Sequence, residues 1–202
     1  TVDTDPEYHL FFGKMRMCNT KFVENSLQKA DSVTGFYIDI FPFDAIPDQK
    51  DLMMRQIRKA ERLSMLLSVS KVKEPQIGKY SKMKTIFMTT IWYMLHYGMK
   101  MFHITGEHIW KKCQNTFWKY DDEKTERITC FFPNAEKWII KTKELEQLEE
   151  GRFENIKIKI PIGYDAILTR NYGDYMKLPP KEERVNHMPV LIQFLNEEEV
   201  SL

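Results

Sequence analysis

The chain has 202 residues, which is enough for one sizeable domain, and its 30 lysines and arginines nearly balance 29 aspartates and glutamates. This balance gives no basic footprint for nucleic acid, and 43% apolar residues exclude a disordered chain. The three cysteines have no metal-ligand spacing, which favours reduced thiols and a cytoplasmic location.

Short β-like runs come first, in residues 9–24. Lys14 and Arg16 alternate there with Met15 and Met17, so the two basic side chains lie on one side of a predicted strand. Two interpretations stay open. The pair could bind phosphate groups, with arginine suited to a bidentate grip, or it could form a solvated strand face.

A second predicted strand carries one carboxylate inside an apolar run. In "TGFYIDIFPFDAIPD", residues 34–48, Phe36 to Phe41 predict a strand buried on both faces, which Pro42 ends. Asp39 lies in its middle, where an isolated charge costs several kcal/mol unless it is compensated. A metal ion, a buried arginine or a turn that it caps could each supply that compensation.

Helical patterns occupy the middle of the chain. Asp48 is typical of an N-cap, and apolar spacing predicts a helix from Lys50 to about Ser70. Residues 82–104, "KMKTIFMTTIWYMLHYGMKMFHI", predict a buried helix that continues to about Tyr120. An interfacial membrane helix and a membrane span are the alternatives, although lysines and histidines interrupt the segment.

The last third of the chain alternates between strand and helix patterns. Arg127 to Phe132 predicts a strand, and Phe153 to Ile160 predicts a half-exposed strand near a sheet edge. A short helix follows from Asp165, with Gly173 as its C-terminal stop. The whole predicts one α+β domain over residues 1–202, with a variable helical insertion over residues 50–125.

Residues 163–184, "GYDAILTRNYGDYMKLPPKEER", gather polar and aromatic groups around a glycine and a double proline. A rigid loop of this kind suits a binding platform, and a surface loop whose tyrosines fill the domain edge is the alternative. The candidate binding residues in it are Arg170, Tyr172, Asp174, Tyr175 and Lys177.

Two blocks, "GFYIDIFPFDAIPD" at 35–48 and "IPIGYDAILTRNYGDYMKLPP" at 160–180, resemble the two signature blocks of the LicD family. This family comprises bacterial phosphocholine transferases related to fukutin. The segments at 5–26 and 152–165 are similar to the regions that precede these blocks, and the two blocks occur in the expected order. The resemblance therefore covers most of the chain, apart from residues 50–125.

The resemblance implies a nucleotidyltransferase-like mixed sheet and transfer of a phospho-group from a nucleotide-activated donor such as CDP-choline. The acceptor would be a cell-surface glycan or its lipid-linked precursor. It also implies Mg²⁺, because phosphoryl transfer depends on cations that neutralise phosphate charge. Nothing in residues 1–33 resembles the family's Asp-rich metal cluster, and the chain opens with Thr1 rather than Met. We therefore expect an N-terminally truncated, inactive fragment that lacks the first catalytic strands.

Within this resemblance the candidate residues acquire roles. Asp39 becomes the catalytic third metal carboxylate, and Lys14, Arg16, Arg170 and Lys177 become phosphate ligands. The rings of Tyr172 and Tyr175, close to Asp174 in the sequence, could hold a quaternary ammonium by cation–π attraction.

Other functions stay open. The chain could be a non-catalytic glycan- or nucleotide-binding module. It could also be a protein in which residues 82–104 dock on a partner or on the inner face of a membrane. The histidines show no ligand spacing, and His187 lies near the second block without a catalytic partner.

Overall fold

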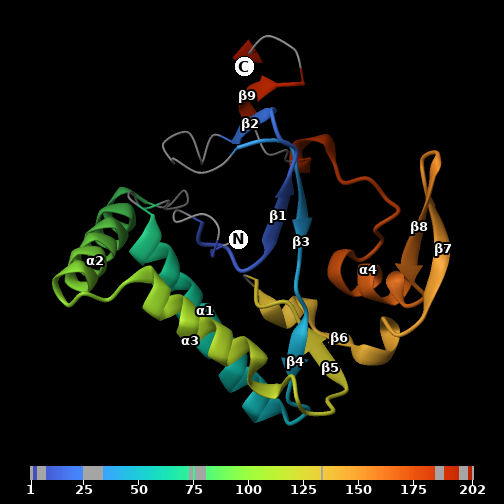
Figure 1. Cartoon of the computed structure of the whole chain (residues 1–202), viewed down its shortest axis with the longest axis horizontal. Helices are drawn as coiled ribbons and strands as arrows, with labels where there is room; N and C mark the ends of the chain where they lie inside the picture. The colour runs from blue at the N-terminus through green and yellow to red at the C-terminus, as the bar shows by residue number, and fades with distance from the viewer. Residues whose placement is uncertain are drawn as a thin grey trace. The chain divides into compact units, whose positions relative to one another are not determined.

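The computed structural model describes residues 2–3, 8–24, 34–72, 75, 81–132, 134–184, 189–195 and 200–201 (Figure 1). His187 and parts of the segment 5–26 lie outside these residues. The chain divides into two compact units. The first comprises Thr1–Pro42, Arg62–Gln114 and Val185–Leu202, and the second comprises Phe43–Glu61 and Asn115–Arg184. Both contain helix and sheet, as the predicted α+β class requires. The nucleotidyltransferase-like sheet and the single domain stay predictions.

In the first unit, two antiparallel strands bring the first motifs together. Strand β1 (Gly13–Arg16) pairs with β3 (Tyr37–Ile40), and the register sets Lys14 opposite Asp39 (Figure 1). Strand β2 (Lys21–Glu24) pairs with β9 (Pro189–Gln193), which also pairs with β10 (Val200–Ser201). Residues far apart in the sequence thus meet on one strand pair.

The prediction that β3 is buried on both faces is wrong. Ile38 is 70% exposed and Ile40 is 50% exposed, whereas Tyr37 and Asp39 are half-buried. Among the described residues β3 pairs with β1 alone, and a two-stranded ribbon has no layer on each side to bury both faces. The more polar face of the ribbon is the one that packs inward.

Gly35 fixes the entry into β3. Its φ of +140° lies in a region that residues with a side chain rarely adopt, and an added Cβ would lie 2.8 Å from the Met17 carbonyl oxygen. Buried Thr20 completes this junction: its hydroxyl donates to the Met17 carbonyl oxygen (2.8 Å) and accepts the Phe36 N–H (3.1 Å). The glycine at the start of the first block is therefore a backbone requirement.

Helix α1 (Lys50–Lys71) confirms the helix predicted for this segment and runs through both units. The described part of residues 82–120 does not form one helix. Helix α2 (Lys82–Met101) ends before His103, whose φ is +53°, and α3 (Gly106–Phe117) leads into the 3₁₀ turn η2 (Trp118–Tyr120). The predicted burial of this segment is also wrong, because many of its large apolar side chains are exposed.

No helix in the described part of the chain is long and apolar enough to cross a membrane.

In the second unit, β4 (Asp44–Ile46), β5 (Arg127–Thr129) and β6 (Ile140–Lys141) form an antiparallel sheet, which confirms a strand at the start of the predicted segment 127–132. Ile46 and Thr129 are fully buried, and the Thr129 hydroxyl donates to the Ala135 carbonyl oxygen at 2.7 Å. Ala135 opens the 3₁₀ turn η3 (Ala135–Trp138).

Asp48 does not act as the predicted N-cap of α1. The helix begins at Lys50, and the Asp48 carboxylate instead accepts the Glu126 N–H, with nitrogen–oxygen distances of 3.2 and 3.3 Å. Gln56, on the first half of α1, donates its side-chain N–H to the Thr116 carbonyl oxygen at 2.8 Å. These polar contacts tie the start of α1 to β5 and to the end of α3.

A hairpin and a short helix follow. The 3₁₀ turn η4 (Thr142–Glu144) leads to β7 (Leu148–Phe153), which pairs with β8 (Ile156–Pro161), the strand predicted from alternation. Helix α4 (Tyr164–Tyr172; Figure 1) ends at Gly173, whose φ of +67° fits the predicted stop. The 3₁₀ turn η5 (Lys181–Glu183) is the last element of this unit.

Candidate functional site

The first group of site residues lies on the strand pair β1–β3. The Lys14 Nζ atom lies 3.2 Å from Asp39 Oδ1 and 3.3 Å from the centre of the Tyr37 ring, while the Arg16 guanidinium carbon lies 5.6 Å from that ring centre. The Tyr37 hydroxyl donates to Glu24 at 2.7 Å. We call Lys14, Arg16, Glu24, Tyr37 and Asp39 the β1–β3 cluster.

Lys14 is the most enclosed charge of this cluster. Its side chain is 8% exposed and that of Asp39 is 27% exposed. Burial lowers the pKa of Lys14, and the neighbouring Asp39 only partly opposes that shift. The carboxylates of Asp39 and Glu24 supply the negative charge that faces this ammonium group. Burial, followed by the hydrogen bond to Glu24, raises the pKa of Tyr37, which keeps its phenol neutral.

The position of Asp39 in an apolar run is explained by this ion pair. The compensating group is the Lys14 ammonium from the neighbouring strand, rather than the arginine that the sequence suggested. Among the residues that the structure describes, no group of three or more His, Cys, Asp or Glu side chains could hold a metal ion. The described donors therefore do not fit Mg²⁺ by themselves, and the magnesium site stays a prediction.

The second group lies on α4 and the turn after it. Both terminal nitrogens of Arg170 donate to the Glu144 carboxylate, at 2.9 and 2.8 Å, and the Tyr175 hydroxyl donates to Asp165 at 2.7 Å. The hydrogen bonds from Arg170 hold the pKa of Glu144 below its usual value. The predicted phosphate ligand Arg170 thus already binds a carboxylate.

The sequence analysis did not identify Glu144, although this residue contacts both Arg170 and Gly163 in the second group. The Gly163 N–H donates to its carbonyl oxygen at 3.2 Å, and a Cβ on Gly163 would lie 2.6 Å from the Glu144 Cβ atom. The glycine of "GYD" in the second block was the available signal, since it marks a close backbone approach.

The remaining members of the second group face solvent. Tyr172 is 62% exposed and its ring lies edge-on to Trp138, with 6.3 Å between the ring centres. Asp174 and Lys177 are exposed in a turn that the Lys177 N–H closes onto the Asp174 carbonyl oxygen at 3.1 Å. The β1–β3 cluster belongs to the first unit and this group to the second.

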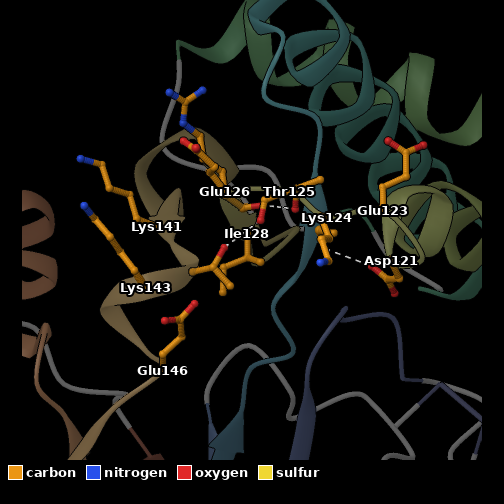
Figure 2. Close-up of a pocket in the computed structure, with 12 residues that line it drawn as sticks. Asp121, Glu123, Lys124, Thr125, Glu126, Ile128, Lys141, Lys143 and Glu146 are labelled. Carbon is orange, nitrogen blue, oxygen red and sulfur yellow. Dashed lines mark hydrogen bonds between the residues drawn. The ribbon is translucent and has the colours of Figure 1, made fainter.

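An open pocket of about 710 Å³ lies along the β4–β5–β6 sheet of the second unit. Figure 2 shows Lys141 and Lys143 extending side by side at one end, with Asp121 and Glu123 at the other. None of the residues singled out from the sequence lines it. Its mixed lining of basic and acidic side chains does not define a ligand.

Next to this pocket, Asp44 is a carboxyl group with an unusual environment. Burial, reinforced by the nearby charge of Asp121, raises its pKa to about 6. Asp121 itself accepts the Ala45 N–H at 3.0 Å. Because folding favours the protonated form of this carboxyl group, its contribution to the stability of the unit is lost as the pH rises through about 6.

The chain is similar to one curated enzyme across most of its length. It is 22% identical over 173 residues to the lipopolysaccharide cholinephosphotransferase LicD of Haemophilus influenzae, a match that covers 84% of this chain. The resemblance to the LicD family that the two sequence blocks indicate is thereby confirmed. The chain spans about 60% of the length of that relative. No family model and no solved structure matches the chain.

Proposed function

We propose that this chain is part of a transferase related to LicD. The reaction would move a phosphocholine-like group from a nucleotide-activated donor such as CDP-choline to a cell-surface glycan or its lipid-linked precursor. The observation that carries this proposal is the similarity over 173 residues to a lipopolysaccharide cholinephosphotransferase. A stretch that covers 84% of the chain must include its middle, from the first sequence block to the start of the second.

The β1–β3 cluster supports a phosphate-binding role. Lys14 and Arg16 both lie on its inward face, and burial lowers the pKa of Lys14. A donor phosphate would be attracted by both cations, and the planar Arg16 guanidinium could grip two phosphate oxygens. In the complete transferase, Lys14 and Arg16 would stabilise the charge on the phosphoryl group as its bond to the departing nucleoside monophosphate breaks and its bond to the acceptor hydroxyl forms.

The choline-like head group needs an apolar, electron-rich surface. The exposed ring of Tyr172 suits this, because a cation over an aromatic face gains ~0.5–2 kcal/mol. Arg170 takes a positioning role here, since it grips Glu144 and so fixes the C-terminal turn of α4 that carries Tyr172. Asp174 and Lys177, on the turn that follows Tyr172, are exposed as well.

We propose that these 202 residues bind the donor without turning it over. Residues 1–33 lack the Asp-rich cluster of the family, and Asp39 is already paired with Lys14. Calorimetric titration with CDP-choline should show weak binding, and a radiolabelled donor should yield no product with a glycan acceptor. Product formed by this chain alone would contradict the proposed inactivity.

Arg16→Ala tests the proposed phosphate contact. We expect roughly tenfold weaker binding of CDP-choline, because a charge-assisted contact is worth ~1.5–3 kcal/mol. The matched control is Arg152→Ala, an exposed arginine on β7 of the other unit. If the two variants bind the donor equally well, the β1–β3 cluster is not the phosphate site.

A non-catalytic binding module is the second candidate, favoured by the lack of any cluster of metal-ligating side chains in the described residues. An assay of the complete gene product that contains this sequence distinguishes the transferase from the binding module. Transfer of label from CDP-choline to lipopolysaccharide supports the transferase. Donor binding without transfer by that complete protein supports the binding module.

A further inference from the structure

Helix α2 exposes apolar side chains along one face, within which Thr90 is the polar member and donates its hydroxyl to the Ile86 carbonyl oxygen at 2.9 Å. Six large side chains between 61% and 84% exposed recur along it at helical spacing; they are Met83, Ile86, Phe87, Met94, Tyr97 and Met101. At 100° per residue these positions fall within a single stripe about a third of the circumference wide. We call them the outward face of α2. An exposed stripe of this length marks an interaction surface.

The side of α2 that packs inward is the more polar one. It carries Thr85, Thr89, Trp92, His96 and Met99. The His96 Nδ1 atom lies 2.7 Å from the Val69 carbonyl oxygen of α1, and the His96 ring stacks on Trp92 with 4.9 Å between centres. A helix of a globular domain normally turns its most apolar stripe to the core, whereas α2 packs a mixed polar and apolar side inward and leaves its most apolar stripe exposed.

The charged side chains of α2 itself have one sign. Lys82, Lys84 and Lys100 are exposed, and residues 82–104 contain no aspartate or glutamate. On a helical projection Lys82 and Lys100 border the stripe on one side and Lys84 borders it on the other. Lysines in this position can reach outward along an apolar layer and place their ammonium groups at its polar boundary.

We propose that the outward face of α2 docks on the surface of an anionic phospholipid bilayer. The helix lies parallel to the surface, with its apolar side chains among the acyl chains and its lysines at the phosphate level. A second copy of the chain fits less well. A symmetric contact between two such faces would bring like charges of the two copies together, such as Lys82 and Lys100, and residues 82–104 contain no carboxylate.

This inference does not rest on the proposed transfer reaction. Its test is co-sedimentation of the 202-residue chain with vesicles, in the absence of any nucleotide donor. We expect the chain to bind vesicles that contain phosphatidylglycerol. Its affinity for vesicles of phosphatidylcholine alone should be lower by about tenfold or more, because each basic group near an anionic surface adds ~1 kcal/mol. Added salt should weaken the binding.

Two pairs of matched variants assign the binding to α2. Phe87→Asp with Met94→Asp should reduce vesicle binding about tenfold or more, because charged groups replace buried apolar ones. The control is Phe153→Asp with Met176→Asp, which changes side chains that are 61% and 81% exposed in the other unit. Lys82, Lys84 and Lys100 changed to Gln should also weaken binding, whereas the same change at Lys137, Lys157 and Lys159 should not.

Three results would overturn the inference. One is the absence of binding to phosphatidylglycerol vesicles at low salt. Another is equal loss of binding in the α2 variants and their controls. The third is a concentration-dependent dimer, seen by sedimentation velocity without lipid, that Phe87→Asp with Met94→Asp abolishes; this would assign the outward face to a second copy of the chain.

Discussion

Asp39 and Lys14 form a largely enclosed ion pair, and each depends on the other. Asp39→Asn would leave the Lys14 ammonium, 8% exposed, without its ion-pair partner. We expect the free energy of unfolding to fall by about 1–3 kcal/mol, since removal of one partner costs more than the pair itself contributes. Urea denaturation followed by circular dichroism measures this change.

A double-mutant cycle measures the coupling energy between Lys14 and Asp39 and shows how much of it depends on burial. Lys14→Met combined with Asp39→Asn should cost less than the sum of the single changes, because no charge is then left alone. Lys157 and Glu150 form a matched exposed pair on the β7–β8 hairpin, with side chains 73% and 52% exposed. Their coupling should stay below about 0.5 kcal/mol. Equal coupling in the two pairs would contradict the role assigned to burial.

The stability of the second unit should depend on the protonation of Asp44. Its pKa is raised from 3.8 to about 6 in the folded chain, so folding favours the protonated carboxyl. The stabilisation is complete below pH 3.8 and is lost as the pH rises through about 6. The unfolding free energy of the wild type, measured relative to that of the Asp44→Asn variant, should therefore increase as the pH falls.

Glu144, in the same unit, should change the stability with pH in the opposite direction to Asp44. The hydrogen bonds from Arg170 lower its pKa, so its contribution is present above the unfolded-state pKa and is lost as the pH falls. Glu144→Gln should therefore be most harmful near neutral pH. Urea titrations of the wild type, Asp44→Asn and Glu144→Gln over the acid range test both signs, and parallel pH profiles for the two variants would refute them.

At the scale of elements, the junction between η4 and α4 has no room for a side chain at Gly163. An added Cβ would lie 2.6 Å from the Glu144 Cβ atom and 2.7 Å from its carbonyl oxygen. Gly163→Ala should destabilise the chain by about 1–3 kcal/mol, because backbone must shift to accept it. Thermal unfolding measures this loss.

Gly98, within α2, is the matched control. An added Cβ there meets nothing within 4 Å, and alanine is the better helix former. Gly98→Ala should be neutral or stabilise the chain by about 0.5–1 kcal/mol. If both substitutions have the same effect, the close approach at Gly163 does not constrain the fold.

Apolar spacing and turn residues correctly predicted helices that depend on contacts between residues close in sequence. The apolar spacing of residues 50–70 gave α1, and the glycine stop after Tyr172 gave the end of α4. The ion pair of Lys14 with Asp39 depends on the register between β1 and β3, which no local pattern contains. Periodicity also shows that a strand or helix has two faces without showing which one packs inward. For β3 and α2 the more polar face packs inward, and the predicted burial was wrong for that reason.

At the scale of the whole molecule, the reactivity of one buried cysteine in each unit shows whether that unit is folded. Cys113 lies in the first unit and Cys130 in the second, and both are buried, whereas Cys18 is exposed. Burial raises the pKa of Cys113 to about 12 and that of Cys130 to about 11, so neither forms the reactive thiolate in the folded chain. Only Cys18 should react rapidly with Ellman's reagent at neutral pH.

The same thiols test whether the two units unfold together. Helix α1 runs without interruption through both units, so we expect one cooperative transition. In a Cys18→Ser background, Cys113 and Cys130 should become reactive at the same urea concentration. Different midpoints, read from single-cysteine variants, would show that each unit unfolds by itself.

The exposed methionines of α2 make its outward face susceptible to oxidation. Met83, Met94 and Met101 are exposed, whereas Met53 and Met99 are buried. Peroxide converts an accessible methionine to its sulfoxide, which is polar, and sulfoxide reductases reverse that change. Mild oxidation would therefore make three of the six outward side chains polar, while Ile86, Phe87 and Tyr97, the buried methionines and the fold persist. Attachment of the chain to a bilayer would then depend on the oxidative state of its surroundings, weakened by oxidant and restored by reduction.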